Sequence, residues 1–528
     1  MKKLRKSSAA LIIIVLFLFA IAMRLDLLAL GSNNLVQIQR FMEVVRVINE
    51  LYFEEVDSKE LVDSAINGML EKLDPHTVYL AKEQVQEVRE RFEGEFEGIG
   101  IEFMILDKIP TIVSPIAGSP SEQLGLRPGD QIVKIEGAST YGFTEDQVRQ
   151  KLLGKKGTKV EVQIKRPTLG EPFDLTIIRD KIPIYSISSA FMIEPKTGYI
   201  RVGRFAKTTN DEFEKALEEL DSQEMRRLIL DLRGNSGGYL DQAVEMVDKF
   251  LESGKRIVYT RGRISSSNED YYSTSESAYS KLPLIVLINH GSASASEIVA
   301  GAIQDWDRGL IVGETSFGKG LVQNQISLKE GAAIRVTIAR YYSPSGRLIQ
   351  RSYENGFLDY VRDGYDDLDP NSQIDSTSTE PVFTTSSGRK VFGGGGITPD
   401  IKIKSVQLTM STVKMIQSQT LFQFSSEYAT NHPNLGRNFE IFKKEFDVEQ
   451  SAVNNLFEKV RQAKIDIDEA ELKQDIDFIK RRMKSQIARH LWSSKEFYQM
   501  EVLQDEQVNY ALKKFSEAEK IANFTIDE

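Results

Sequence analysis

The sequence predicts an α/β multidomain protein: a central α/β core with an inserted β-rich domain, a helical N-terminal region and a helical C-terminal domain. Three observations predict this fold class. Apolar residues repeat at spacings of three and four from Leu35 to about Arg91, and the chain after Ser405 is rich in Lys, Glu and Gln and poor in glycine, so both ends are predicted to be helical. Short apolar runs separated by glycine and proline follow the first helical stretch, and strand and helix patterns then alternate from residue 182 to about residue 403.

The composition excludes several kinds of chemistry. The 528 residues include no cysteine, so disulfides, thiolate nucleophiles, iron–sulfur clusters and cysteine–zinc sites are ruled out. Four histidines leave histidine chemistry open but thinly supplied. The 67 basic and 77 acidic side chains give a net charge of -10, which argues against a large nucleic-acid interface. We expect no nucleic-acid partner, no metal and no cofactor.

Residues 1–30 have the pattern of an export signal or a membrane anchor. Four basic residues between positions 2 and 6 precede an apolar run from Ala9 to Met23. The run is short for a bilayer span of about 20 residues, and no clear cleavage site follows, so a cleaved signal and a retained anchor both stay open. Basic residues before the run keep that end in the cytoplasm. The remaining chain is therefore expected in the periplasm or on the outer face of the inner membrane.

Residues 31–91 form the predicted helical N-terminal region, and residues 92–180 the β-rich domain. In the β-rich domain, Gly98-Ile99-Gly100-Ile101 alternates glycine with isoleucine. Such a loop leaves successive backbone N–H groups free, and N–H groups clustered in this way bind a carboxylate. The strand that follows can accept an extended peptide by strand addition.

Residues 181–404 form the predicted α/β core, and residues 405–528 the helical C-terminal domain. Within the core, residues 353–380 hold eight acidic side chains and one basic side chain, which is typical of an acidic surface insertion. Two turns rich in glycine and serine leave buried strands at Arg233–Gly238 and Asn289–Glu297. The carboxyl ends of such strands are where α/β proteins bind ligands, and the second turn opens a helix whose free amides favour an anion.

A serine nucleophile in the second turn needs a base, and the sequence offers His290 or Lys319. His290 is disfavoured because no Gly-x-Ser-x-Gly pattern surrounds the serines and sequence neighbours seldom form a triad. The stretch before Lys319 nearly spells a phosphate-binding loop, but Gly320 stands where that loop needs a hydroxyl, and a strand pattern follows. A lysine base must be neutral, which burial of its amine can achieve. Gln323 could orient that amine without adding charge.

These motifs resemble the C-terminal processing, or tail-specific, serine peptidases, which carry a PDZ domain. The resemblance runs in family order through most of residues 35–403. It rests on these segments: Asp74–Thr77, Gly98–Phe103, Ser119–Gly137, Asp231–Gly238, Ser292–Glu297, Gly318–Gln323, Tyr342–Arg347 and Gly393–Asp400.

The resemblance implies a role for each site residue. Ser294 would be the nucleophile, Lys319 the general base and Gln323 an auxiliary residue. The oxyanion hole would be formed by the amides of Ala295 and of one glycine of the Gly237-Gly238 pair, with Gly237 preferred. Spacing alone does not choose Ser294 over Ser292 or Ser296. The β-rich domain would be a PDZ domain of the permuted bacterial type. The amides that capture a peptide C-terminus would then be those of Ile99, Gly100 and Ile101.

The expected function is that of a serine endopeptidase that cleaves envelope or periplasmic proteins near their C-termini. The expected partners are protein substrates with free C-terminal tails and, through residues 1–30, the inner membrane; a second copy of the chain or an adaptor protein is left open. The alternative is a non-catalytic peptide-binding scaffold on the same fold. It is disfavoured because serine, lysine and glutamine all stand at the family spacing.

Overall fold

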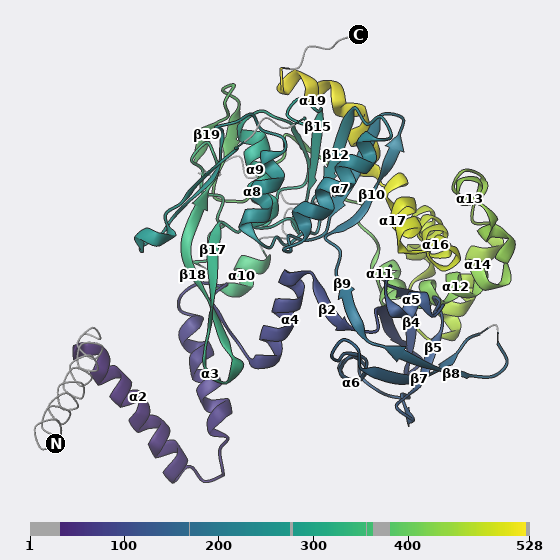
Figure 1. Ribbon diagram of the computed structural model, residues 1–528, viewed down its shortest axis with the longest axis horizontal. Helices are drawn as coiled ribbons and strands as arrows, with labels where there is room; N and C mark the ends of the chain where they lie inside the picture. The colour runs from purple at the N-terminus through teal and green to yellow at the C-terminus, as the bar shows by residue number, and fades with distance from the viewer. Residues whose placement is uncertain (1–31, 168, 275–277, 355, 363–380, 524–528) are drawn as a thin grey trace, which may run out of the picture. The chain divides into compact units, whose positions relative to one another are not determined.

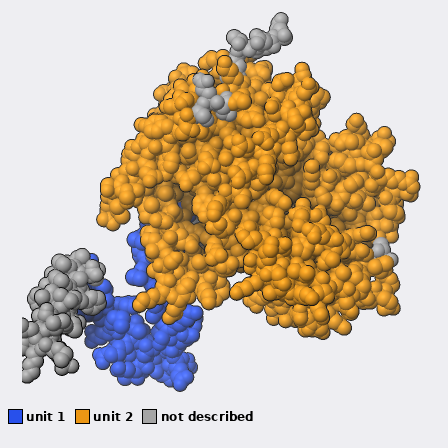
Figure 2. Space-filling model, viewed as in Figure 1, with its two compact units in different colours: residues 1–79 blue, residues 80–528 orange. Residues whose placement is uncertain are grey.

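The computed structural model describes residues 32–523 apart from 168, 275–277, 355 and 363–380 (Figure 1). The chain divides into two compact units, residues 1–79 and residues 80–528 (Figure 2). The predicted export segment and most of the acidic insertion lie outside the described residues. Within the described ranges, no helix combines the length and apolar character needed to cross a membrane.

The first unit is helical, as its spacing predicts. It contains α2 (Ser32–Leu51) and α3 (Ser58–Leu70), and β1 (Val78–Leu80) follows at its end. The Asp57 side chain caps α3 by accepting from the Lys59 amide at 2.8 Å. Beyond α3, the Asp74 carboxylate accepts from the His76 amide at 2.9 Å, which forms a turn around Pro75.

The second unit is built on a six-stranded sheet of mainly parallel strands. Its order is β10-β11-β12-β15-β16-β21, and only β10 runs antiparallel to its neighbour. The strands are β10 (Ile187–Glu194), β11 (Thr197–Val202), β12 (Arg227–Asp231), β15 (Leu284–Ile288), β16 (Leu310–Gly313) and β21 (Ile401–Lys402). The two predicted buried strands are β12 and β15, which lie side by side, so the turns that follow them meet at one edge of the sheet.

Helices cover both faces of this sheet (Figure 1). One face packs against α7 (Thr209–Asp221), α8 (Leu240–Asp248) and α9 (Ala295–Asp305). The other face packs against the last helices of the chain, α17 (Ser494–Leu503), α18 (Glu506–Ala511) and α19 (Phe515–Ile521). The end of the expected C-terminal domain is therefore a layer of the α/β core, since its apolar side chains are buried on the sheet.

A second, antiparallel sheet flanks the core. It joins β13 (Arg256–Arg261), β14 (Asp270–Tyr272), β17 (Leu321–Ser327) and β18 (Ala333–Tyr342). β17 begins two residues after Lys319 and contains Gln323, so the hairpin keeps these two residues close to one another. Shorter elements in the same part of the chain are α10 (Phe357–Arg362), β19 (Val382–Thr384), β20 (Lys390–Phe392), η1 (Ser265–Ser267) and η2 (Lys329–Gly331).

The β-rich domain is an antiparallel sheet with two short helices. Its strand order is β3-β4-β5-β7-β8, which leaves β3 at an edge. The domain contains β3 (Ile101–Leu106), β4 (Ile109–Pro115), α5 (Pro120–Gln123), β5 (Gln131–Ile135), β6 (Ala138–Ser139), α6 (Glu145–Leu152), β7 (Lys159–Lys165) and β8 (Phe173–Ile178). It is flanked in the sequence by α4 (Lys82–Glu93) and by the paired strands β2 (Glu95–Gly98) and β9 (Asp180–Pro183). The domain has its own core around Ile112, Ile132 and Val148.

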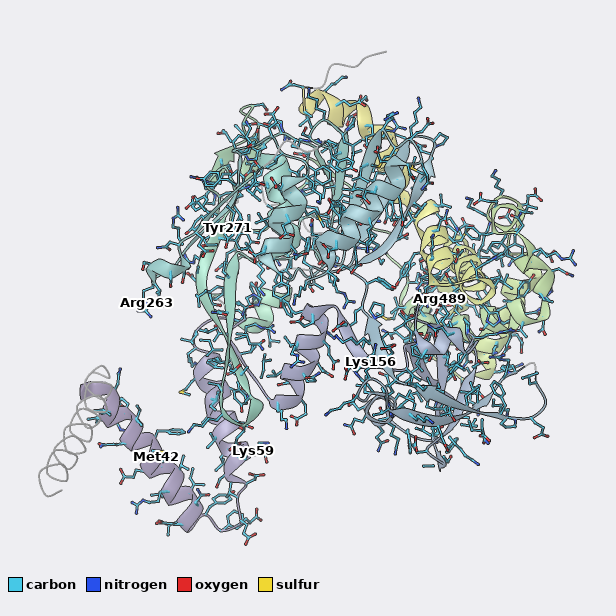
Figure 3. The ribbon with its side chains drawn as sticks, viewed as in Figure 1. Met42, Lys59, Lys156, Arg263, Tyr271 and Arg489 are labelled. Atoms are coloured by element: carbon cyan, nitrogen blue, oxygen red, sulfur yellow. The ribbon has the colours of Figure 1, made fainter. Side chains whose placement is uncertain are left out.

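The remaining helices form a cluster with a separate apolar core. They are α11 (Met410–Gln417), α12 (Thr420–Asn431), η4 (Pro433–Arg437), α13 (Phe439–Glu445), α14 (Gln450–Gln462), α15 (Glu469–Gln474) and α16 (Ile476–Leu491). The short η5 (Leu512–Lys514) lies between α18 and α19, and its Leu512 packs with them on the core sheet. Phe422 of α12 packs on Leu106 and Val113 of the β-rich domain. Arg489 of α16 lies over the Phe497 ring, 3.9 Å from its centre (Figure 3). The α/β class with helical ends is confirmed, and the C-terminal segment contacts both the β-rich domain and the core.

Candidate active site

Ser294 lies at the sharp turn between β15 and α9. Its backbone has φ +55° and ψ -111°, a conformation that is uncommon for a residue with a side chain and costs on the order of 1–3 kcal/mol. The Ser294 amide donates to Glu297 Oε2 at 2.7 Å, which helps to hold the turn. The structure thus builds a strand-to-helix elbow around a serine although the glycines of the usual elbow pattern are missing.

The structure distinguishes the three serines of this turn. The Ser292 hydroxyl is buried and donates to the carbonyl oxygen of Leu232 at 2.8 Å. The Ser296 hydroxyl is also buried and donates to the carbonyl oxygen of Asn235 at 2.8 Å. Ser294 alone of the three is partly exposed. Burial and hydrogen bonding therefore favour Ser294 as the nucleophile, a choice that spacing left open.

Lys319 lies in the loop between β16 and β17 and is partly buried. Its Nζ donates to Gln323 Oε1 at 2.8 Å, so the predicted pair is in contact. Gln323 stands at an irregularity of the β17–β18 pairing, and such bulges re-aim side chains. The Tyr341 hydroxyl lies 2.7 Å from the carbonyl oxygen of Lys319 and 3.1 Å from that of Ser294. One phenol thus links the lysine loop to the serine turn.

The buried carboxylate of Glu297 is a second link between these two segments. Besides the Ser294 amide, it accepts from the Ser316 hydroxyl at 2.6 Å, the Gly318 amide at 2.6 Å and the Lys319 amide at 2.9 Å. Burial raises the pKa of Glu297, while these hydrogen bonds act in the opposite direction. In the sequence, Glu297 is only the last residue of the Ser292–Glu297 motif, without a predicted role of its own. The Ser-x-x-Glu spacing of a capping box was the available signal for its contact with Ser294.

Gly237 lies against the serine turn. A Cβ atom at this position would stand 2.8 Å from Ser294 Cβ and 3.0 Å from the Ala295 nitrogen, and its φ of +98° also requires glycine. The Gly237 amide, however, donates to Asn235 Oδ1 at 2.9 Å. The Gly237 amide would therefore have to leave Asn235 Oδ1 before it could bind an oxyanion. In the described part of the chain, the amides of Gly238 and Ala295 donate no hydrogen bond.

The loop expected to bind a peptide carboxylate turns its carbonyl groups inward. The Gly100 carbonyl accepts from the Ser119 hydroxyl at 2.9 Å, and the Ile99 carbonyl accepts from the Ser121 hydroxyl at 2.7 Å. Among the described residues, the amides of Ile99 and Gly100 have no acceptor. Ile101 begins the edge strand β3 and pairs with Pro115. The loop thus offers two free amides beside an open strand edge.

His290 faces a buried carboxylate. Its Nδ1 lies 3.5 Å from Glu314 Oε2. Burial pushes the pKa of Glu314 upward, but hydrogen bonds from His290 and Ser405 outweigh it and lower that pKa below its ordinary value. His290 thus has a carboxylate partner within the core. Over the residues that the structure describes, no group of three or more histidine, aspartate and glutamate side chains is arranged to hold a metal ion.

Comparison with known families covers most of the chain. Residues 196–356 match the family model of peptidase family S41, residues 111–166 that of a PDZ domain, residues 28–84 that of the activating protease CtpB N-terminal domain, and residues 412–493 a family of unknown function.

Two curated relatives decide the family. The chain is 33% identical to the carboxy-terminal processing protease CtpA of Bacillus subtilis over 71% of this chain and 83% of the relative. It is 39% identical to the carboxy-terminal-processing protease of Bartonella bacilliformis over 60% of this chain and 74% of the relative. The chain belongs to the C-terminal processing serine peptidases. The family resemblance seen in the sequence is confirmed, and with it the assignment of a serine peptidase that carries a PDZ domain.

Solved structures of similar proteins include two related to this peptidase. The photosystem II D1 C-terminal processing protease is 26% identical, with coverage of 69% of this chain and 92% of that chain and a TM-score of 0.35. The PDZ domain of a carboxy-terminal protease from Vibrio cholerae, solved in complex with a peptide, is 33% identical, with coverage of 17% of this chain and 97% of that chain and a TM-score of 0.16.

An open pocket of about 440 Å³ lies along the β17–β18 hairpin of the peptidase. It is basic and aromatic, and Arg263, labelled in Figure 3, is one of its lining residues. Thr337, which pairs with Gln323 across the hairpin, also lines it. None of the predicted site residues lines this pocket, which is therefore distinct from the Ser294 turn.

Gly237→Ala is expected to lower the kcat of the peptidase by about 100-fold, the order of the loss when reacting groups are misplaced by about 1 Å. The added methyl group would press on Ser294 and on the Ala295 amide. Gly234→Ala is the matched control, because Gly234 also has a positive φ of +70° but its added Cβ would meet nothing within 4 Å. Both variants are assayed on one tail peptide. Equal activity of the two variants would show that the close approach of Gly237 is unimportant.

Proposed function

We propose that this peptidase uses a Ser294–Lys319 dyad, assisted by Gln323, to cleave proteins near their C-termini. The observation that carries the proposal is the shared carboxylate of Glu297, which accepts from the backbone amides of both Ser294 and Lys319. The Tyr341 hydroxyl reinforces this link through the carbonyl oxygens of the same two residues. Two segments that lie apart in the sequence are thus held in one arrangement.

The dyad supports acyl transfer. Neutral Lys319 takes the proton of Ser294 Oγ as this oxygen attacks the peptide carbonyl, and the resulting ammonium gives the proton to the leaving amine. Water then attacks the acyl-enzyme with Lys319 again as the base. Gln323 is suited to hold Nζ, because a neutral amide adds no negative charge that would favour the ammonium form.

The oxyanion of the tetrahedral intermediate would be stabilised by backbone amides. Ala295 supplies one of them at the start of α9, where the helix leaves its first amides unpaired. The second comes from the Gly237-Gly238 pair. Gly237 can serve only if its amide exchanges Asn235 Oδ1 for the oxyanion, whereas the Gly238 amide needs no such exchange.

A serine-reactive fluorophosphonate tests the nucleophile directly. The reagent forms a covalent bond to an activated serine oxygen with loss of fluoride, and peptide mass spectrometry locates the adduct. We expect the adduct on Ser294 and a parallel loss of peptidase activity. An adduct on Ser292 or Ser296 accompanied by the same loss of activity would overturn the assignment.

We further propose that the PDZ domain binds the free C-terminus of the substrate through the amides of Ile99, Gly100 and Ile101. The free amides and the edge strand support this role. The substrates are then envelope or periplasmic proteins, because the basic residues before the apolar run between Ala9 and Met23 favour export of the rest of the chain. Fractionation of cells that express the full chain, followed by protease accessibility of intact spheroplasts, tests this location.

A tail peptide with an amidated C-terminus is expected to be cleaved with a KM about 10-fold higher than that of the free acid, since the loop amides lose a charged acceptor. Gly100→Ala should abolish this preference, because a Cβ there would stand 2.2 Å from Ser119 Cβ. Gly118→Ala, which adds a methyl group at a positive φ of +78° in open space, is the control. Equal KM values for the two peptides in the unmodified enzyme would contradict carboxylate recognition.

A further inference from the structure

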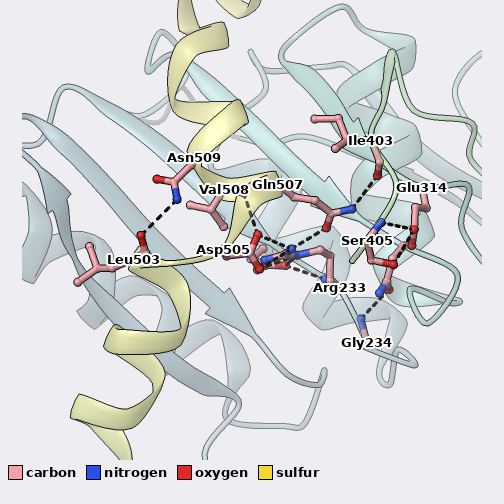
Figure 4. A network of polar contacts seen from close by, with 12 residues as sticks. Arg233, Gly234, Glu314, Ile403, Ser405, Leu503, Asp505, Gln507, Val508 and Asn509 are labelled. Atoms are coloured by element: carbon pink, nitrogen blue, oxygen red, sulfur yellow. Dashed lines mark hydrogen bonds and ion pairs between the residues drawn. The ribbon is translucent and has the colours of Figure 1, made fainter. Parts of the chain in front are cut away.

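Arg233 connects the loop that follows β12, residues Arg233–Gly238, to the C-terminal helices (Figure 4). Its Nε and Nη2 bind the carboxylate of Asp231 at the end of β12, with a shortest distance of 2.6 Å. Its Nη1 points the other way, to Asp505 Oδ2 at 2.9 Å and Gln507 Oε1 at 2.7 Å. The guanidinium therefore bridges the strand that carries the loop and a segment 272 residues away.

Most of this bridge is shielded from water. Asp231 is fully buried, the Arg233 side chain is 12% exposed and Gln507 is 4% exposed, while the Asp505 side chain is 29% exposed. A charged group in such surroundings needs its partners, because a buried donor that loses its acceptor keeps the full cost of desolvation. Loss of the C-terminal acceptors would leave Nη1 without these partners, while Asp231 would still hold Nε and Nη2. We therefore expect Arg233 and the loop backbone attached to it to be less firmly held.

The loop that Arg233 anchors is bonded to the serine turn. The Gly234 amide donates to Asn289 Oδ1 at 2.8 Å. The carbonyl oxygen of Asn235 accepts from the Ala293 amide at 3.0 Å and from the Ser296 hydroxyl at 2.8 Å. These contacts flank Ser294 on both sides in the sequence, so a displacement of the loop reaches the nucleophile and the amides beside it.

The C-terminal acceptors are themselves fixed. Asp505 caps α18, where its Oδ1 accepts from the Val508 amide at 3.0 Å. The Gln507 side-chain amide donates to the carbonyl oxygen of Ile403 at 2.7 Å, directly after β21. The apolar face of α18 and α19, including Val508 and Phe515, is buried on the core sheet. The helix therefore presents both acceptors to Arg233 at a set position.

We propose that Asp505 and Gln507 are positioning residues of the active site, which act through Arg233 on the loop that flanks Ser294. The proposal rests on Ser294 as the nucleophile. It makes the C-terminal segment a component of the catalytic machinery, although that segment lies outside residues 196–356, which match the peptidase family.

Asp505→Asn in the full chain is the central test. Asparagine is as good a helix cap as aspartate, so the substitution keeps α18 capped and removes the charge that faces Arg233. We expect kcat on a tail peptide to fall 10- to 100-fold, as when a remote change misplaces reacting groups, with KM changed less than twofold. The rate of fluorophosphonate labelling of Ser294 should fall by a similar factor. Asp505→Glu, which restores the carboxylate, should recover part of the loss.

Asp468→Asn is the matched control, because Asp468 also caps a helix of the C-terminal segment, accepting from the Ala470 amide at 2.8 Å. It is expected to leave kcat unchanged. In an Arg233→Gln background, Asp505→Asn should have no further effect on kcat, because the residue through which it acts is gone.

Three outcomes overturn the inference. In the first, Asp505→Asn keeps kcat within twofold while Ser294→Ala is inactive, which leaves the proposed function standing. In the second, the losses of kcat caused by Asp505→Asn and by Arg233→Gln multiply in the double variant. In the third, Asp505→Asn lowers kcat only in step with a fall in melting temperature and in affinity for the tail peptide, which marks a merely structural role. Activity retained by Ser294→Ala would instead contradict the proposed function itself.

Discussion

Ser294→Ala is expected to reduce cleavage of a tail peptide by about 10⁴-fold or more and to leave the chain folded. The substitution removes the hydroxyl that is proposed to attack the substrate, and what would remain is binding and oxyanion stabilisation alone. The fold should be unaffected, because Ser294 contributes backbone rather than side-chain contacts to the turn: its amide bonds Glu297, and its carbonyl oxygen lies near the Tyr341 hydroxyl. Steady-state kinetics and a thermal melt of the same preparation check both parts.

Ser292→Ala serves as the opposing control. Its buried hydroxyl bonds the Leu232 carbonyl, and loss of this contact should lower the free energy of unfolding by about 1–3 kcal/mol. Activity at a temperature where this variant is folded should stay within about 10-fold of the unmodified enzyme. If Ser292→Ala were inactive and Ser294→Ala active, the nucleophile would be Ser292.

Lys319→Ala is expected to lower kcat by about 10³-fold, within the range for loss of a general base. Lys319→Arg should be equally poor, since a guanidinium stays protonated and cannot accept the serine proton. Gln323→Ala should cost less, because Lys319 Nζ loses one orienting acceptor and keeps its ability to take a proton. Single-turnover measurements with a nitrophenyl ester, whose nitrophenolate leaves without a proton, isolate the step in which lysine is proposed to act as base.

His290→Ala supplies the contrast for the lysine variants. The imidazole faces Glu314, and its removal should lower stability more than kcat, since Glu314 loses a hydrogen-bond partner in a buried setting. Full activity of Lys319→Ala combined with an inactive, folded His290→Ala would transfer the role of base to histidine. Full activity of both Lys319→Ala and His290→Ala would show that neither residue is the base for Ser294.

Much of this protein could be read from local patterns. The change from helical spacing to short strands and then to alternating strands and helices predicts the α/β class, because side-chain periodicity follows directly from backbone geometry. The turn before α9 and the lysine loop after β16 are visible because glycine, serine and charged residues interrupt buried strands there. The spacing of four between Lys319 and Gln323 predicts a contact that the structure has.

Local patterns could not predict the contacts that span long stretches of chain. Glu297 binds the Lys319 amide across 22 residues, and Asp505 reaches Arg233 across 272. Nothing in the composition of α18 and α19 indicates that they cover one face of the core sheet. An amphipathic pattern shows that a helix has a buried face, but it does not show which surface that face packs against. The occupied amide of Gly237 likewise depends on how Asn235 is turned, which the fold decides.

The sequence by itself therefore determined the class of the fold, the order of its parts and the residue types available for catalysis, because these depend on local spacing and chemistry. The tertiary structure alone decided which serine is exposed, how Glu297 joins the serine turn to the lysine loop, and which helix supplies the distant acceptors of Arg233. Those features depend on burial and on hydrogen bonds between distant segments, and both arise only when the chain is packed.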